Sequence, residues 1–539
     1  MGDSSATSDD RLPVSVLDTE RLAHRIAALR GARKEHTLRG IRRGIEKESL
    51  RVSPKGHIAQ TPHPAPLGSA LTHPHITTDY SEALLEFITP AYEHVTDCLL
   101  FLADTHHFVY EQLGDELLWA NSMPCVVGDE LSIPIAQYGS SNLGRFKTVY
   151  RHGLWHRYGR HMQAIAGIHY NVSFPDNFWW AYRQNEGAAS TDLQEFTSRE
   201  YFALIRNYQK YVWLVAYLTG ASPAMCASFL RGRSHDLASA DGHTLYRPYA
   251  TSLRLGDLGY SNSAQKKLAV SYNSLAAYVD SLDTAIRTPH PDFARIGVES
   301  GGEWKQLNGN ILQMEAEFYG SIRPKCVPLP GERLVSALRD RGVEYVEMRS
   351  LDLNPFLPVG IDHETSYFME LFATFCLLHD SPPQGEAELA QNKANLRIAV
   401  NEGRSPDARI VLDGTEAPLR EWGFALCEAM YPVARLLDEA RPSSQGYSRS
   451  LAAQRRKFVD PAQTPSARVL NDLRERELSF FGFAMAQSLA ARDHFRAQPL
   501  APARREFFEH LAAESLEEQR ELEAADSQPF ADYVAAFYR

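Results

Sequence analysis

One stretch organises this sequence: Gly44-Ile45-Glu46-Lys47-Glu48-Ser49-Leu50-Arg51-Val52, which we interpret as a β-strand. Alternate side chains of a strand point to opposite faces, so Glu46 and Glu48 would share one face. Their carboxylates would lie roughly 6.5–7 Å apart, and at an effective dielectric of about 20 two charges at that distance repel by about 2.4 kcal/mol. Water would relieve most of this repulsion in a solvated edge strand. The segment alone does not decide between such a strand and a functional site.

The composition is that of a globular protein with enough length to bury a large core. The chain has 539 residues, of which 44% are hydrophobic and 23% are charged, and its length alone would suggest roughly three or four domains. The net charge is −11, and lysines and arginines are spread along the sequence. Because nucleic-acid-binding faces are usually basic stripes or patches, we expect no nucleic acid as a partner.

The cysteines and the N-terminus indicate a cytoplasmic protein. Six cysteines lie far apart, with neither a Cys-x-x-Cys pair nor a zinc spacing, at Cys98, Cys125, Cys226, Cys326, Cys376 and Cys427. We therefore expect reduced thiols. Residues 1–20 are small and polar, lack the pattern of a signal peptide, and are expected to be disordered within a flexible segment 1–35. The most apolar long run, residues 211–220, is too short for a membrane span, so no membrane partner is expected.

Two segments have the apolar spacing of scaffold helices. Apolar residues between positions 95 and 113 recur every three or four residues, which predicts a helix that ends at Gly114. His106 lies within that apolar stripe. We interpret it as a core histidine with a hydrogen-bond partner, because no second metal ligand stands at helical spacing. A capping box at Thr197 predicts a second helix that runs to Gly220.

Two other segments alternate between polar and apolar side chains, which is typical of strands with one polar face. Residues 168–174 place three polar side chains on one face: His169, Asn171 and Ser173. Residues 343–351 place the carboxylate of Glu347 beside the guanidinium of Arg349. A half-exposed strand and a surface salt bridge would account for these patterns without any function, so both interpretations stay open at this point.

The segment 77–90 adds acidic side chains beside apolar ones. Asp79, Glu82 and Glu86 would align on a helix, whereas Glu82, Leu84 and Glu86 would align on a strand. We favour a turn at Asp79 that leads into a strand around Glu86, since a proline ends the run. In either case carboxylates stand beside apolar residues, where an isolated charge is costly.

The nearest approach to a phosphate-binding loop is the segment 139–148. Its two glycines have the Walker A spacing, but Arg145-Phe146 stands where that motif requires Lys-Ser or Lys-Thr, so the segment fails as a P-loop. The alternative is a turn that presents Arg145, Lys147 and Arg151 to anionic groups.

Six segments together strongly resemble the proteobacterial type of glutamate–cysteine ligase. In chain order they are residues 44–52, 76–90, 137–151, 167–171, 249–260 and 344–355. They occur in the family's order across most of residues 38–380, and the closing segment 523–530 is similar to the family's C-terminus. The similarity is weakest in the first 35 residues and through much of 380–510.

Members of that family join the γ-carboxylate of L-glutamate to the amine of L-cysteine with ATP, through a γ-glutamyl phosphate, in the first step of glutathione biosynthesis. The resemblance therefore implies an ATP-dependent ligase whose small-molecule substrates are L-glutamate, L-cysteine and ATP. It implies more than one Mg²⁺, with Mn²⁺ as a substitute ion, because both steps gather negative charge at one place. Feedback inhibition by glutathione is a further expectation from the family.

The resemblance also assigns roles to particular residues. The implied magnesium ligands are Glu46, Glu48, Asp79, Glu86 and Glu347. Clustered carboxylates become favourable once cations share them, which agrees with this assignment. The residues implied in catalysis are Arg349 at the transferred phosphoryl group, Arg151 at the phosphates and His169 near the γ-carboxyl group. The implied substrate-binding residues are Arg254 for the glutamate α-carboxylate, and Tyr150, Tyr260, Tyr319, Tyr80 and Leu154 for the cysteine pocket. Core packing is the alternative for each tyrosine.

The family's fold is α+β and glutamine-synthetase-like, a curved and mainly antiparallel sheet that forms a funnel with helices packed outside. The alternating strands are compatible with it, although their pattern alone would give only α+β. We therefore expect one large domain with a catalytic sheet region over residues 36–380. Over 381–539 we expect a helical layer, because the sequence there becomes rich in Ala, Leu, Glu and Arg.

Other functions are compatible with parts of the sequence. A carboxylate–amine ligase with a different amine acceptor would need the same ATP and metal machinery. A glycosidase would use paired carboxylates without ATP, but five acidic positions mixed with arginines exceed what two carboxyls require. A non-catalytic relative is disfavoured by the complete acidic set.

Overall fold

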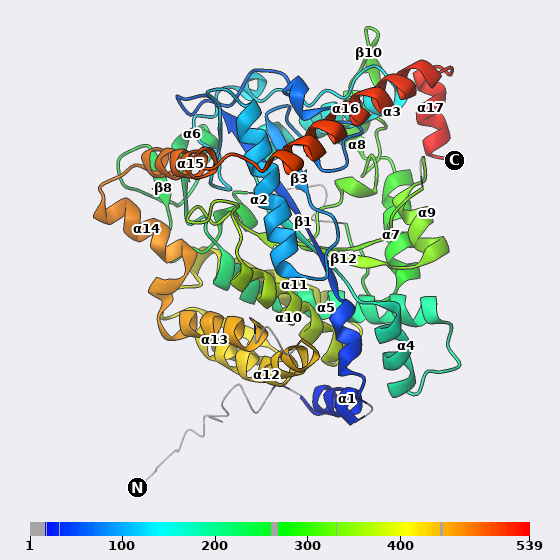
Figure 1. Ribbon diagram of the computed structural model, residues 1–539, viewed down its shortest axis with the longest axis vertical. Coiled ribbons are helices and arrows are strands. Elements are labelled where there is room, and N and C mark those ends of the chain that lie inside the picture. The colour runs from blue at the N-terminus through cyan, green and yellow to red at the C-terminus, as the bar shows by residue number, and fades with distance from the viewer. Residues whose placement is uncertain (1–16, 18, 32, 260–267, 330, 442–445) are drawn as a thin grey trace.

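The computed structural model describes residues 17, 19–31, 33–259, 268–329, 331–441 and 446–539. Its centre is an antiparallel sheet in the order β11-β12-β5-β1-β3-β2, and β4 pairs with the end of β1. The strands of this sheet are β1 Arg42–Val52, β2 Ile76–Thr78, β3 Leu84–Ile88, β4 Leu117–Leu118, β5 Ile168–Ser173, β11 Ile322–Lys325 and β12 Tyr345–Leu351. The expected α+β fold with a mainly antiparallel sheet is confirmed (Figure 1).

β1 is a central strand of this sheet. It pairs with β3 on one side and with β5 on the other, and Arg42 is its only exposed residue. The alternative of a solvated edge strand is therefore wrong. One face of β1 is covered by α2 (Val95–Gln112), where the Nζ atom of Lys47 lies 2.9 Å from Nε2 of His106. The other ring nitrogen of His106 lies 2.7 Å from the carbonyl oxygen of Leu102, so the interpretation of His106 as a hydrogen-bonded core residue is confirmed.

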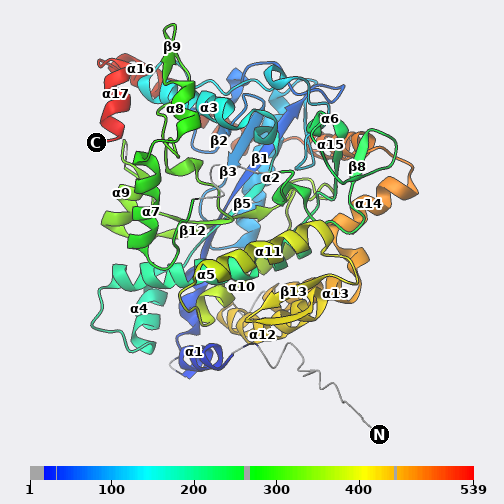
Figure 2. The same cartoon turned by 180° about the vertical axis from the view of Figure 1, so that it is seen from behind.

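Two long helices support the sheet on the side of α2. α5 (Leu193–Thr219) packs against β11 and β12, and α10 (His363–Leu378) packs against α2, α5 and β5 (Figure 2). α5 ends at Gly220 as predicted but begins four residues earlier than the capping box at Thr197 indicated. The side chain of Asp192 caps it, accepting hydrogen bonds from the backbone N–H groups of Gln194 and Glu195.

The remaining elements surround this core. The other helices are α1 Glu20–Gly31, α3 Asn142–Tyr158, α4 Asp176–Asn185, α6 Ala227–Leu230, α7 Leu275–Arg287, α8 Pro291–Ile296, α9 Leu334–Arg341, α11 Glu386–Glu402, α12 Leu419–Ala440, α13 Gly446–Val459, α14 Pro465–Glu475, α15 Phe480–Arg496, α16 Pro502–Ala525 and α17 Phe530–Phe537. The small sheets are built from β6 Ala224–Cys226, β7 Ala238–Ser239, β8 Thr244–Tyr246, β9 Glu299–Ser300, β10 Glu303–Trp304, β13 Arg409–Leu412 and β14 Thr415–Pro418. Among the described helices, none combines the length and the apolar character needed to cross a membrane.

The two ends of the chain differ from expectation. α1 lies within the segment expected to be flexible, and it buries Leu22, Ile26 and Leu29 along one side. For these residues the expectation is wrong, while residues 1–16 lie outside the described part of the chain. The expected helical layer after residue 380 contains α11 to α17 and also the hairpin of β13 and β14. The placement of a boundary near residue 380 stays a prediction.

The segment expected as a turn is the first part of α3. Ser141 precedes this helix, and its hydroxyl oxygen accepts a hydrogen bond from the backbone N–H of Gly144 at 3.1 Å. This is N-cap geometry, which satisfies one of the free N–H groups at a helix start. Arg145, Lys147 and Arg151 therefore project from a helix, and the interpretation of a turn is wrong.

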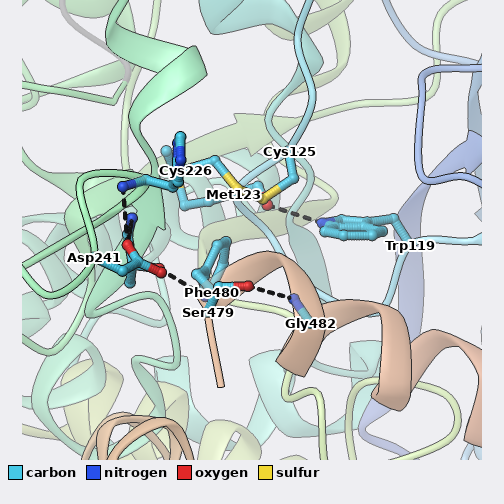
Figure 3. The surroundings of a disulfide bond; sticks show 10 residues. Trp119, Met123, Cys125, Cys226, Asp241, Ser479, Phe480 and Gly482 are labelled. Atoms are coloured by element: carbon cyan, nitrogen blue, oxygen red, sulfur yellow. Dashed lines mark hydrogen bonds between the residues drawn. A yellow bond between two sulfur atoms is a disulfide. The ribbon is translucent and has the colours of Figure 1, made fainter. Parts of the chain in front are cut away.

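A disulfide joins Cys125 to Cys226, which corrects the expectation of six reduced thiols (Figure 3). The bond connects the segment after β4 to the end of β6 across a sequence separation of 101 residues. Both cysteines are buried beside Trp119, whose indole N–H donates to the carbonyl oxygen of Met123 at 2.9 Å. The other four cysteines are free and buried. Spacing could not reveal this pair, because its partners meet only through the fold.

Candidate active site

Four neighbouring strands, β3, β1, β5 and β12, present polar side chains on one face of the sheet. In the strand register three pairs of residues lie directly opposite each other: Glu46 with His169, Glu48 with Glu86, and Glu347 with Asn171. Residues directly opposite each other in an antiparallel pair share a face, and the alternation along each strand repeats that face every second residue. The acidic strands found in the sequence thus build one continuous polar surface, opposite the face that packs on α2.

His169 stands between the acidic side chains of this surface. Its Nδ1 atom lies 3.0 Å from a carboxylate oxygen of Glu46 and 3.2 Å from one of Glu347, and its Nε2 atom lies 3.7 Å from one of Glu48. Burial, together with the nearby Arg349, lowers the pKa of His169 although the Glu46 and Glu347 carboxylates oppose this. The ring is therefore neutral near pH 7 and offers a nitrogen lone pair.

The carboxylates on the β12 side of the surface are neutralised by the protein itself. The Nζ atom of Lys325 lies 2.9 Å from one oxygen of Glu347, and Nη1 of Arg349 lies 2.5 Å from the other. Burial acts to raise the pKa of Glu347, but Lys325 and Arg349 hold it well below its usual range. Burial and Glu347 likewise act to raise the pKa of Glu46, and His169 and Lys325 together lower it. Both carboxylates are charged.

The carboxylates on the β1 and β3 side have no such partners. Among the described residues, no lysine or arginine forms an ion pair with Glu48 or Glu86. Glu48 accepts a hydrogen bond from the backbone N–H of Gly167 at 2.6 Å. Even so, burial and the nearby Asp79 raise the pKa of Glu48 to about 8. Burial, Asp79 and the neighbouring glutamates raise the pKa of Glu86 well above its usual range.

A divalent cation fits between Glu86 of this unbalanced half and the adjoining Glu46 and His169. Glu46, Glu86 and His169 each offer one ligand atom, and these three atoms lie within 4.8 Å of one another. The buried oxygen Oδ1 of Asn171, whose amide nitrogen donates to Glu46 at 2.8 Å, has no hydrogen-bond partner among the described residues. Carboxylate and amide oxygens are the ligands that Mg²⁺ prefers, and a neutral imidazole can join them. A cation would supply the positive charge that Glu86 and its neighbours lack.

The structure thus brings acidic residues expected from the sequence onto one face, but the group of possible metal ligands differs from the expected set of five carboxylates. Glu46 and Glu86 belong to the three-residue group and His169 completes it, although the sequence placed His169 with the catalytic residues. Glu48 and Glu347 share the polar face outside that group.

Arg254 lies beside this surface in a short helical turn after Ser252. Its Nη2 atom donates to the carbonyl oxygen of Arg349 at 3.1 Å, and its Nη1 atom lies 3.5 Å from Asp352. A Cβ atom on Gly167 would lie 1.9 Å from the Arg254 Nη2 atom, so only glycine leaves room for the guanidinium group. The buried Arg254 is thereby fixed next to Arg349.

The helix α3 carries three of the expected site residues: Tyr150, Arg151 and Leu154. The Nε atom of Arg151 donates to the carbonyl oxygen of Asp79 at 2.5 Å, and the guanidinium lies 4.6 Å from the centre of the Tyr138 ring. These contacts connect α3 to the turn between β2 and β3. Burial, followed by the nearby Glu317, raises the pKa of Tyr150, so its hydroxyl stays neutral.

The other tyrosines occupy different positions. Tyr80 is 2% exposed, and its hydroxyl has no hydrogen-bond partner among the described residues. Tyr319 is half-buried in the segment before β11. Leu154 is half-buried and packs against the main core. Tyr260 lies outside the described residues.

The sequence did not reveal three residues that shape the site: Lys325, Asp352 and Gly167. Lys325 and Arg323 alternate along β11, a period-two signal that could have been noticed, but their pairing with Glu347 depends on strand register. Asp352 accepts hydrogen bonds from the backbone N–H of Ala221 and from the Ser222 hydroxyl, both at 2.8 Å. No local sequence pattern predicts these contacts.

The relation of the chain to known proteins agrees with this geometry. A family model described as glutamate-cysteine ligase matches residues 26–399. A glutamate–cysteine ligase from Alcanivorax borkumensis is 53% identical over 524 residues, which cover 96% of this chain and 99% of the relative. One from Azotobacter vinelandii is 50% identical over 521 residues, which cover 96% of this chain and 98% of the relative.

Solved structures give the same relation. The crystal structure of a glutamate–cysteine ligase from Francisella tularensis in complex with AMP has a TM-score of 0.87 and 36% identity, covering 92% of this chain and 97% of that chain. A bifunctional glutathione synthetase from Pasteurella multocida has a TM-score of 0.73 and 23% identity, covering 90% of this chain and 58% of that chain, and this likeness concerns the fold alone.

Proposed function

The chain belongs to the glutamate–cysteine ligase family, and we propose that the polar face of its sheet is where L-glutamate is joined to L-cysteine with ATP. The observation that carries this proposal is that the carboxylates in the two halves of the polar face differ in how their charge is compensated. Lys325 and Arg349 neutralise the Glu347 half, whereas Glu48 and Glu86 have no lysine or arginine at ion-pair distance among the described residues and keep raised pKa values although Arg349 lies nearby. A polyphosphate with its divalent cations completes such a face. The AMP held by the Francisella tularensis relative supports an adenine nucleotide as the phosphoryl donor.

The proposed reaction has two steps. A γ-carboxylate oxygen of glutamate attacks the γ-phosphorus of ATP, the new O–P bond forms, and the bond to the bridging oxygen breaks so that ADP leaves. The cysteine amine then attacks the activated carbonyl carbon, the C–N bond forms, and inorganic phosphate leaves with the former carboxylate oxygen. The nitrogen loses a proton to give the neutral amide of γ-glutamylcysteine.

Positive side chains are placed where negative charge develops. Arg349 reaches beyond Glu347 on the same strand and would contact the transferred phosphoryl group. Lys325 would hold Glu347 charged and oriented while this occurs. Arg151, fixed to the Asp79 carbonyl oxygen, would assist at the phosphates. His169 would act as a neutral ligand, since its lowered pKa leaves one ring nitrogen unprotonated near pH 7 while the other keeps its N–H.

The metal-holding residues would be the acidic set with His169: Glu46, Glu48, Asp79, Glu86 and Glu347. Bound Mg²⁺, or Mn²⁺ in its place, supplies charge neutralisation at the phosphate oxygens. More than one ion is consistent with a set of five carboxylates in which Glu48 and Glu86 keep raised pKa values.

Arg254 would bind the α-carboxylate of glutamate. Its guanidinium is buried beside Arg349, which would set the substrate's γ-carboxylate next to the phosphoryl group. Tyr150, Tyr319, Tyr80 and Leu154, with Tyr260, would form the pocket for the cysteine side chain. The unpartnered Tyr80 hydroxyl supports a polar contact within that pocket.

An isotope experiment tests this proposal directly. Glutamate labelled with ¹⁸O in the γ-carboxyl group is incubated with ATP, Mg²⁺ and cysteine, and the products are examined by mass spectrometry. An acyl phosphate transfers one labelled oxygen to inorganic phosphate, together with cysteine-dependent formation of γ-glutamylcysteine. Unlabelled phosphate would exclude the acyl phosphate. Faster turnover with another amine than with cysteine would favour the alternative acceptor, and added glutathione in the same assay tests feedback inhibition.

A further inference from the structure

We propose that the C-terminal segment 523–538 is a positioning element for the cysteine pocket, and that Asp526 and Glu523 hold α3 where Tyr150 and Leu154 face the acceptor. The inference rests on the proposed role of Tyr150 in that pocket. It gives a function to two features of the sequence that the reaction leaves unexplained: the acidic closing segment 523–530 and the glycine-containing segment 139–148 that fails as a P-loop.

The two acids occupy the N-terminus of α3. Glu523 accepts a hydrogen bond from the backbone N–H of Ser140 at 2.8 Å, and Asp526 accepts one from the backbone N–H of Asn142. The first N–H groups of a helix lack internal partners and carry partial positive charge, which attracts anions. In a P-loop such groups cradle phosphate. Here the protein's own carboxylates fill that place, so the segment serves as a docking point for the C-terminus.

The fit at this docking point is close. Gly139 has a φ angle of +81°, and a Cβ atom on it would lie 2.2 Å from a carboxylate oxygen of Glu523 and 2.2 Å from Nε2 of Gln519. Gln519 in turn accepts a hydrogen bond from the Ser69 hydroxyl at 2.5 Å. The end of α16 is therefore anchored to the body of the protein before it meets α3.

α17 continues this contact along α3 through a small apolar core (Figure 1). The rings of Phe146 and Phe537 lie 4.7 Å apart, and the Arg145 guanidinium lies 4.3 Å from the centre of the Phe530 ring. The buried members of this second core are Phe146, Val149, Leu307, Phe530 and Val534, and Tyr150 packs against them. The second core is separate from the main core, so the position of Tyr150 depends on α17.

The last residues also contact the segment that precedes Tyr319. The Tyr538 hydroxyl donates to the carbonyl oxygen of Gln313 at 2.7 Å, and the Gln313 amide donates to the carbonyl oxygen of Tyr150 at 3.2 Å. A Cβ atom on Gly153 would lie 2.0 Å from Oε1 of Gln313, which shows how closely this side chain covers α3. The C-terminus thus joins the helix that carries Tyr150 to the segment that leads to Tyr319.

Steady-state kinetics of three full-length variants test this inference. Asp526→Asn and Glu523→Gln remove one charge each at the docking point, and Tyr538→Phe removes one hydroxyl. We expect each to raise the KM for cysteine by about five- to tenfold, with the KM values for glutamate and ATP within about twofold of the parent. Asp526→Glu, which keeps the carboxylate, is expected to restore the KM for cysteine toward the parent value. Glu521→Gln is the matched control, because this exposed side chain on α16 forms no hydrogen bond or ion pair among the described residues.

Two outcomes would overturn the inference. An unchanged KM for cysteine in the Asp526 and Tyr538 variants would do so, and so would an equal change in all three KM values, since that would indicate general destabilisation. Tyr150→Ala separates the inference from its premise. If Tyr150→Ala raises the KM for cysteine and the C-terminal variants do not, only the positioning role fails. If Tyr150→Ala leaves it unchanged, the pocket assignment fails and the inference with it.

Discussion

The two halves of the polar face differ in where their positive charge comes from. On β12, Glu347 is held by Lys325 and Arg349, and its pKa lies well below the usual range. On β1 and β3, Glu48 is also buried and Glu86 is half-buried, but both have raised pKa values. The residues are of the same type and lie on the same sheet. The protein thus completes one half itself, and under the proposed function bound cations would complete the other.

This division has a physical reason. A buried carboxylate needs either a fixed partner or a proton, because its charge is costly in a low-dielectric interior. A fixed partner is useful where a side chain must stay oriented toward a transferred phosphoryl group. A missing partner is useful where the ion must arrive with its nucleotide, since the cost of the empty site then favours binding of the cation.

The largest expected effect on turnover follows from removing the carboxylate of Glu46, which adjoins both halves of the polar face. Glu46→Gln should lower kcat by about 10³-fold, because one electrostatic contact at the developing charge is worth that much in comparable sites. Circular dichroism should show an unchanged fold. Glu303→Gln is the control and should retain the parent rate, because Glu303 is exposed on β10, which lies outside the central sheet. A Glu46→Gln enzyme with a near-normal rate would remove Glu46 from the metal-holding set.

The second prediction contrasts the two halves in the metal-free protein. Glu347→Gln leaves the half-buried Lys325 and Arg349 with a weaker partner, so it should destabilise the fold by about 3 kcal/mol, the lower end of the range for breaking a buried pair. Glu48→Gln removes a carboxylate that has no lysine or arginine in ion-pair contact, so it should leave the melting temperature unchanged or raise it. Differential scanning fluorimetry in EDTA gives both values. Shifts of the same sign and size would show that the halves are alike.

The sequence was sufficient to predict much of this face, and the reason is its periodicity. Glu46, Glu48, His169 and Glu347 lie on regular strands, where a period of two fixes the face without knowledge of the partners. The turn at Asp79 and the strand around Glu86 were also predicted correctly.

The contacts between elements could not be predicted in the same way. Lys325 meets Glu347 only through the register of β11 with β12, and the Cys125–Cys226 bond spans 101 residues. At the start of α3 the glycine spacing favours a loop, whereas Ser141 is the N-cap of the helix. Local patterns determine which face a residue occupies, while tertiary packing determines its partner.

The third prediction concerns the pH dependence of the metal-free protein. The pKa of Glu48 is raised to about 8 in the folded state, above its value of about 4.3 in an unfolded chain. The folded state therefore binds more protons between these values, so its stability is fully present below the lower pKa and is lost as pH rises through the upper one. The melting temperature in EDTA should fall between about pH 5 and pH 8.5.

Two controls assign that slope to the unbalanced half. Glu48→Gln should reduce the decline, because one of the two carboxyls with a raised pKa is gone and only Glu86 remains, and saturating Mg²⁺ should flatten it in the parent by stabilising the charged carboxylates. Glu347 changes the stability with pH in the opposite direction. Its pKa is lowered in the folded state, so its contribution to stability is present above the pKa of the unfolded chain and is lost only in acid. A decline that persists in both controls would locate the titrating group elsewhere.

The smallest effect on activity is expected from a substitution of Gly167, which lies against both Glu48 and Arg254. Its N–H holds Glu48, and the position of its missing Cβ atom is occupied by the Arg254 guanidinium at 1.9 Å. Gly167→Ala must displace Arg254, which should raise the KM for glutamate by about tenfold, equivalent to about 1.4 kcal/mol. Gly44→Ala on β1 is the control, because its added methyl group meets nothing closer than 3.8 Å. Since Arg254 is proposed to bind only the α-carboxylate, the KM for ATP should stay constant, and a parallel rise in both would show that Arg254 supports the nucleotide side of the face instead.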